Sequence, residues 1–152
     1  MTPARTAGYS GTPLAKKLGL KDGQIAWFVA LPAELDWLRE SASFAAAKNA
    51  ADHRGLARTR ADVVHGFFTE AKALGKALPT FMKAIAPDGM IWVSWPKKAS
   101  KRATDITEDV IRSLALPIGL VDVKVCAVDD TWSGLKLVIR KERRRQRVLR
   151  LV

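Results

Sequence analysis

Apolar residues gather in short runs along the chain, and stretches rich in polar residues, glycine or proline separate these runs. Residues 25–31 and 90–95 are almost wholly apolar, which is typical of strands that are buried on both faces of a sheet. Residues 121–129 alternate apolar and polar side chains with a period of two, the pattern of a half-buried strand. The pattern also predicts strands within residues 61–69 and 135–141.

Helices are predicted between several of these strands. Residues 12–19 favour a short helix, with Pro13 at its first position and Gly19 just after its end. Residues 70–86 place apolar side chains near a spacing of three to four, which predicts an amphipathic helix. Pro79 should kink or interrupt that helix, because proline lacks the backbone N–H of the helical hydrogen bond.

The remaining segments give signals of different strength. Residues 32–41 and 106–116 favour helices, and residues 87–89, Pro-Asp-Gly, favour a tight turn. The alanines within residues 41–55 favour a helix by propensity, but a short strand is the alternative there.

The order of these elements predicts the fold class. Strands that alternate with helices argue for a mainly parallel sheet with helices on both faces. The last two strands are joined by a turn too short for a crossover helix, so they should pair antiparallel. We therefore expect one Rossmann-like α/β domain in residues 1–141 that ends in an antiparallel hairpin, followed by a basic tail in residues 142–152.

Composition limits the compartment. The chain has 152 residues and a single cysteine, Cys126, so no internal disulfide can form. This cysteine usage is typical of the cytoplasm. The N-terminal segment lacks the apolar region of a signal peptide, and no apolar run reaches the roughly 18 residues of a membrane helix. We expect a cytoplasmic protein without a membrane span, and the oligomeric state stays open, a homo-oligomer included.

Charge adds a candidate partner. The net charge is +11, and residues 140–150 carry +6 of it, because they hold seven Arg and Lys residues and one Glu. Such a tail can attract nucleic acid or an anionic membrane surface, and a solvated extension is the alternative. The arginines that would contact phosphates are Arg143, Arg144, Arg145, Arg147 and Arg150.

Four stretches resemble a known family. GYSGTPLAKKLG, DGMIWVSWPKKAS, TDITEDVIR and GLVDVKVCAVDDTWSGLKLVIRK are similar to a family of small bacterial proteins of unknown function, domain-of-unknown-function family 3052. The resemblance covers residues 8–141 and is weakest within residues 41–55. It implies a fold like that of class I methyltransferases and brings no established activity.

The cofactor site of such methyltransferases is altered in this sequence. They hold S-adenosylmethionine against a glycine-rich turn after the first strand, where the backbone can approach the ligand. Here the corresponding stretch, residues 30–36, reads ALPAELD and contains no glycine. Pro32 also removes one backbone donor, and Ala33 and Glu34 add side chains. We therefore expect no cofactor and assign no catalytic residue.

Metal chemistry finds no support in the sequence either. His53 and His65 are the only histidines, and neither has metal-ligand spacing with Cys126. No metal site is predicted, and His65, which lies within a strand pattern, is expected to be a hydrogen-bonded core residue.

The loop after residues 90–95 is the best candidate for a ligand site. Ligands of open parallel sheets bind beyond the carboxyl ends of strands, and four basic residues follow this strand end. Tryptophan rings could face a base or a cation, and backbone N–H groups near the start of the next helix could assist an anion. The predicted site consists of Ser94, Trp95, Lys97, Lys98, Ser100, Lys101, Arg102, Thr107 and Trp132.

The sequence thus predicts a non-catalytic domain that binds an anionic ligand, either a nucleotide or nucleic acid. A divergent enzyme, such as a methyltransferase that uses the same crevice, is one alternative. A protein-interaction module is another, in which a methyltransferase-like domain has lost its cofactor.

Overall fold

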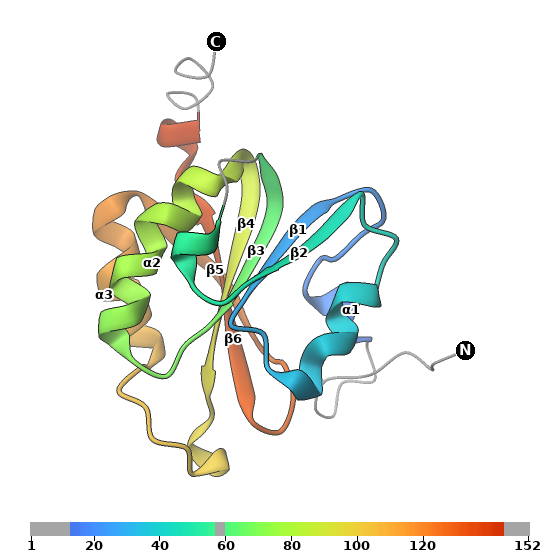
Figure 1. The fold of residues 1–152 in the computed structure, drawn as a ribbon. Helices are drawn as coiled ribbons and strands as arrows, with labels where there is room; N and C mark the ends of the chain where they lie inside the picture. Colours follow the sequence, from blue (N-terminus) through green and yellow to red (C-terminus); the bar gives the residue numbers. More distant parts are fainter. Residues whose placement is uncertain (1–12, 57–59, 145–152) are drawn as a thin grey trace.

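The computed structural model describes residues 13–56 and 60–144, and within them six strands form one sheet in the order β2-β1-β3-β4-β6-β5 (Figure 1). The strands are β1 (Ile25–Val29), β2 (Ala46–Ala50), β3 (Ala61–Phe67), β4 (Ile85–Pro96), β5 (Leu120–Ala127) and β6 (Trp132–Ile139). The first four are parallel, whereas β6 pairs antiparallel with both β4 and β5. The predicted mainly parallel sheet with a C-terminal antiparallel hairpin is confirmed.

Helices cover both faces of this sheet, as predicted (Figure 1). One face carries α2 (Ala71–Ala84) and α3 (Glu108–Ala115), and the other carries α1 (Leu14–Lys17) and the 3-10 helix η1 (Ala33–Glu40). Three short 3-10 turns complete the described chain, namely η2 (His53–Gly55), η3 (Lys98–Ser100) and η4 (Leu116–Ile118). Within the described residues, no helix is long and apolar enough to cross a membrane.

Alternate side chains of the interior strands enter two separate cores. In β1, Val29 packs in the core beneath α2 and α3, whereas Phe28 packs in the core beneath α1 and η1. In β4, Val93 packs in the core beneath α2 and α3, and Trp92 packs in the core beneath α1 and η1. Because both faces are covered, these strands are apolar on every side, which explains the unbroken apolar runs in the sequence.

Two local predictions were wrong. Pro79 does not interrupt α2, which runs continuously from Ala71 to Ala84 because its buried face packs on the sheet. Residues 87–89 do not form a tight turn but belong to β4, whose pairing with β3 shifts register there. A Cβ atom on Gly89 would lie 2.9 Å from the Ala61 carbonyl oxygen, so glycine permits this close approach.

The ambiguous stretch resolves as a strand. Residues 46–50 form β2, which pairs parallel with β1 at one edge of the sheet. The helix propensity of its alanines is outweighed by the backbone hydrogen bonds that this pairing provides. At the start of the chain, Pro13 is the residue before α1 rather than its first residue.

Candidate functional site

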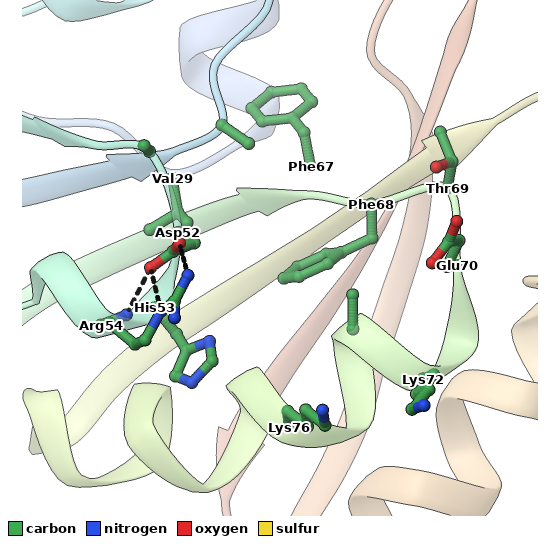
Figure 2. A pocket seen from close by; sticks show the side chains of 13 residues that line it. Val29, Asp52, His53, Arg54, Phe67, Phe68, Thr69, Glu70, Lys72 and Lys76 are labelled. Atoms are coloured by element: carbon green, nitrogen blue, oxygen red, sulfur yellow. Dashed lines mark hydrogen bonds and ion pairs between the residues drawn. The ribbon is translucent and has the colours of Figure 1, made fainter.

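The main cavity lies where the strand order of the sheet reverses. From β1 the chain moves outward to β2 and then returns across β1 to β3. Open α/β sheets bind ligands beyond the carboxyl ends of strands at such a point. A cavity of about 610 Å³ lies at the ends of β1 and β3, with residues 51–54 after β2 and the first part of α2 as its walls (Figure 2). Its volume is in the usual range for small-molecule sites.

Aromatic and charged side chains line this crevice. Figure 2 shows the Phe68 ring extending from the end of β3 toward the turn of Asp52 and Arg54. Lys72 and Lys76 project from α2 below that ring. The crevice therefore combines an aromatic surface with three cations and two carboxylates, namely Arg54, Lys72, Lys76, Asp52 and Glu70.

Asp52 is held at the crevice by hydrogen bonds within its own turn. Its Oδ1 accepts from the backbone N–H of Arg54 at 2.9 Å, and its Oδ2 accepts from the Arg54 guanidinium at 2.8 Å. The hydrogen bond with the Arg54 side chain is the main reason why the pKa of Asp52 is lowered. Asp52 is thus an ordered carboxylate just after β2, where dinucleotide-binding folds place the acidic residue that accepts from ribose hydroxyls.

Lys72 and Lys76 form a pair of like charges. They lie four residues apart on α2, both are exposed, and like charges at this spacing destabilise a helix slightly. Neither of them makes a salt bridge to another residue within 13–56 or 60–144. An anion in the crevice would relieve this repulsion.

The turn after β1 takes no part in the crevice beyond its first residue. Ala30 lines the cavity and has a φ of 56°, the left-handed conformation that non-glycine residues seldom adopt. Its N–H donates to the Ala50 carbonyl at 2.9 Å, which ties the ends of β1 and β2 together. Residues 31–34 are not among the lining residues.

The predicted loop after β4 lines a second, smaller cavity of about 450 Å³. Trp95, Lys97, Lys98 and Thr107 all contribute to it, so the structure brings these four predicted residues together. Carboxylates at the start of α3 share the cavity and offset its positive charge, namely those of Glu108 and Asp109. Thr107 caps α3 by accepting from the Val110 N–H at 3.2 Å, so that donor is already taken.

The other predicted loop residues lie elsewhere or serve the loop itself. The Arg102 guanidinium lies 5.5 Å from the centre of the buried Trp132 ring, a cation–π contact. Ser100 Oγ donates to the Lys97 carbonyl at 2.6 Å and closes the turn η3, after which Lys101 is left-handed with a φ of 59°. Ser94 is fully buried. These residues shape the loop or the core, and their part in binding stays a prediction.

The basic tail is described only at its start. Residues 141–144 form a helical turn, and the Arg144 side chain donates to the Ile139 carbonyl at 2.6 Å. The other described arginine of the tail, Arg143, lies beside Gly119. Three further arginines of the predicted set lie outside the described residues, namely Arg145, Arg147 and Arg150.

Sequence reasoning missed the crevice residues Asp52, Phe68, Lys72 and Lys76. A signal existed, because the strand within residues 61–69 is followed at once by two lysines four positions apart. Placing them beside Asp52 requires the strand order, which the sequence does not state. Among the described residues, no group of three or more His, Cys, Asp or Glu side chains could hold a metal ion.

Comparison with known proteins supports the fold. No family model and no curated protein matches the chain. Among solved structures, a SAM-dependent methyltransferase from Aquifex aeolicus is similar over 83% of this chain and 87% of its own, at 15% identity and a TM-score of 0.58. The chain has a methyltransferase-like fold.

Two further structures agree with this assignment. Magnesium protoporphyrin IX methyltransferase from Synechocystis PCC 6803, with bound SAH, matches at 11% identity and a TM-score of 0.61, over 84% of this chain and 80% of its own. A putative type 11 methyltransferase from Sulfolobus solfataricus matches at 12% identity and a TM-score of 0.60, over 84% of this chain and 90% of its own. Such identities show the fold and leave the activity open.

The crevice does not fit S-adenosylmethionine in the manner of this fold. The turn after β1 has no glycine, and residues 31–34 do not reach the cavity. The walls carry Arg54, Lys72 and Lys76 against the carboxylates of Asp52 and Glu70, and this excess of positive charge disfavours the sulfonium cation of that cofactor. The same charges suit an anion.

Proposed function

We propose that the protein is a non-catalytic domain that binds a nucleotide in the crevice between β1 and β3. The observation that carries this proposal is the pair Lys72 and Lys76, which lines the same cavity as Asp52 at the reversal of the strand order. Positive charge together with a carboxylate matches a ligand that has both phosphates and hydroxyl groups.

Each part of a nucleotide has a counterpart in the crevice. Lys72 and Lys76 can donate charge-assisted hydrogen bonds to phosphate oxygens. Within the part of the chain that the structure describes, the two oxygens of Asp52 accept only from Arg54, so lone pairs remain for ribose hydroxyls. Phe68, which is half-buried at the end of β3, offers a ring for the base.

The proposal of a non-catalytic role rests on the chemistry of the lining residues. The hydrogen-bonded side-chain pair described among these residues is Asp52 with Arg54, in which the guanidinium holds the carboxylate within a turn. A divergent enzyme in the same crevice is the alternative. Membership in domain-of-unknown-function family 3052, the cytoplasmic location and a second anion site at Lys97 and Lys98 stay predictions from the sequence.

The lysine pair should decide nucleotide affinity. Replacing both residues, Lys72→Gln with Lys76→Gln, should weaken ADP binding at least about tenfold, because one hydrogen bond to a charged group contributes about 1.5 kcal/mol or more. Isothermal titration with ADP measures this loss. Lys83→Gln removes a charge from the same helix away from the cavity and should leave the affinity unchanged. Equal ADP affinity in the double variant and the wild type would refute the proposal.

S-adenosylmethionine should not bind appreciably. The missing glycine turn and the cationic walls predict no heat at sub-millimolar ligand in the same titration. A micromolar dissociation constant would contradict this prediction and would favour the divergent enzyme.

A further inference from the structure

Beyond the crevice, the α1 side of the hairpin β5–β6 carries an unusual row of side chains. Lys136 of β6 stands directly opposite Trp92 of β4 on one side and Lys124 of β5 on the other. Directly opposed residues of neighbouring strands point to the same face of a sheet. Trp92 is fully buried under α1, whereas Lys136 is half-buried and Lys124 is exposed. On this face of the sheet, burial therefore decreases from Trp92 on β4 to Lys136 on β6 and Lys124 on β5.

The opposed lysines are an unfavourable arrangement for stability. Like charges directly opposite each other on adjacent strands repel and destabilise the pairing. Burial lowers the pKa of Lys136, and the charges of Lys124 and Lys21 lower it further. Lys124 Nζ lies 5.9 Å from the centre of the Trp92 ring, so its ammonium group stays above this part of the sheet.

Further lysines surround the pair. Cys126 lies on the same face, two residues beyond Lys124. Burial raises the pKa of Cys126, and the charges that oppose this rise belong to Lys124, Lys17 and Lys97. Lys17, the last residue of α1, precedes Leu18, whose carbonyl accepts from the Trp92 indole N–H, so α1 brings a further positive charge to this face of the sheet.

We propose that this lysine face binds the sugar-phosphate backbone of a single-stranded nucleic acid. The lysine face consists of the opposed pair Lys124 and Lys136 and of Lys17, which ends α1 next to the Leu18 carbonyl that accepts from Trp92. A polyanion would neutralise the repulsion between Lys124 and Lys136, neither of which has a salt bridge to another residue within 13–56 or 60–144. The site lies on the opposite face of the sheet from α2, so it is separate from the nucleotide crevice.

The geometry favours a single strand that is held by its backbone. The lysines stand on an open sheet surface, where neighbouring strands are about 4.8 Å apart, and an extended strand can lie along it. The tryptophans beneath this face, Trp92 and Trp132, are buried and offer no ring for base stacking. Binding should therefore be electrostatic and independent of base sequence.

The salt dependence of binding tests this proposal. Fluorescence anisotropy with labelled oligo(dT), measured between about 50 and 200 mM salt, gives the slope of log affinity against log salt. The full-length variant Lys124→Gln with Lys136→Gln should bind more weakly, and its slope should be shallower by about 1.4, since each phosphate contact on a single strand contributes about 0.7. Its thermal stability should equal or exceed that of the wild type, because a like-charge pair is removed.

The controls separate this site from the rest of the chain. Lys48→Gln with Lys83→Gln removes the same charge from β2 and α2 and should leave the slope unchanged. The lysine-face variant should keep its affinity for ADP. A failure of the lysine-face proposal can therefore be distinguished from a failure of the nucleotide proposal. An unchanged slope in the lysine-face variant overturns the inference. Loss of binding to phosphatidylserine vesicles without loss of binding to oligo(dT) also overturns it, in favour of a membrane surface.

Discussion

Lowering the pH from about 6.5 to about 4.5 should reduce the free energy of unfolding by about 2 to 3 kcal/mol through His65 alone. This histidine is 1% exposed in β3, and burial lowers its pKa from 6.5 to about 3. Nε2 lies 2.7 Å from Ser94 Oγ, but Nδ1 has no partner among the described residues. A second proton would therefore place a charged N–H in the core without an acceptor.

The direction follows from the two states of the chain. In the unfolded chain His65 takes up a proton near pH 6.5, while in the folded protein it stays neutral down to about pH 3. The unfolded state thus binds more protons in this window, and stability falls as the pH falls. The carboxylates with lowered pKa, Asp36, Asp52 and Asp122, act at lower pH, because their stabilisation is lost only below the ordinary value of 3.8.

Urea unfolding at a series of pH values measures this effect. His65→Leu with Ser94→Ala replaces both partners by apolar groups and should flatten the profile between pH 6.5 and 4.5 with little change at neutral pH. A profile of the double variant as steep as that of the wild type would show that another group is responsible.

The same residue shows how far sequence reasoning reaches. An apolar strand pattern around His65 predicted its burial, and this is confirmed. The pattern contains no information on the partner, because Ser94 is 29 residues away on the neighbouring strand. Ser94 was predicted to belong to a ligand site, yet its hydroxyl lies in the core beside His65. Two strands must pair in the right register before this contact exists.

Prediction of the candidate site from the sequence was also limited by missing information on strand pairing. The unbroken apolar run of β4 predicted an interior strand, and the basic residues Lys97 and Lys98 do follow its carboxyl end at a cavity. The larger crevice depends on β2, whose alanines gave no clear period. Without β2 in the sheet, Asp52 has no defined position, and its relation to Lys72 and Lys76 is invisible in the sequence.

The largest single effect is expected from Trp92→Ala, which should reduce the free energy of unfolding by about 3 to 5 kcal/mol. Trp92 is fully buried in the interior strand β4, and its indole N–H donates to the Leu18 carbonyl at 2.9 Å. This contact joins residues 74 positions apart and fixes the end of α1 to the sheet. Such a loss is a large share of the roughly 5 to 15 kcal/mol that stabilises a typical domain.

Trp92→Phe separates packing from hydrogen bonding. The phenyl ring keeps most of the apolar volume but leaves the buried Leu18 carbonyl without its donor, so we expect a smaller loss of about 1 to 3 kcal/mol. Trp37→Phe, at a half-buried position in η1, should have less effect than either change. Urea unfolding followed by circular dichroism measures all three, since fluorescence would change with the tryptophans themselves. Hydrogen exchange in residues 14–20 should be faster in Trp92→Ala, because α1 loses its hydrogen bond to the sheet. If the free energy of unfolding of Trp92→Ala lies within about 1 kcal/mol of the wild-type value, Trp92 does not hold α1 to the sheet.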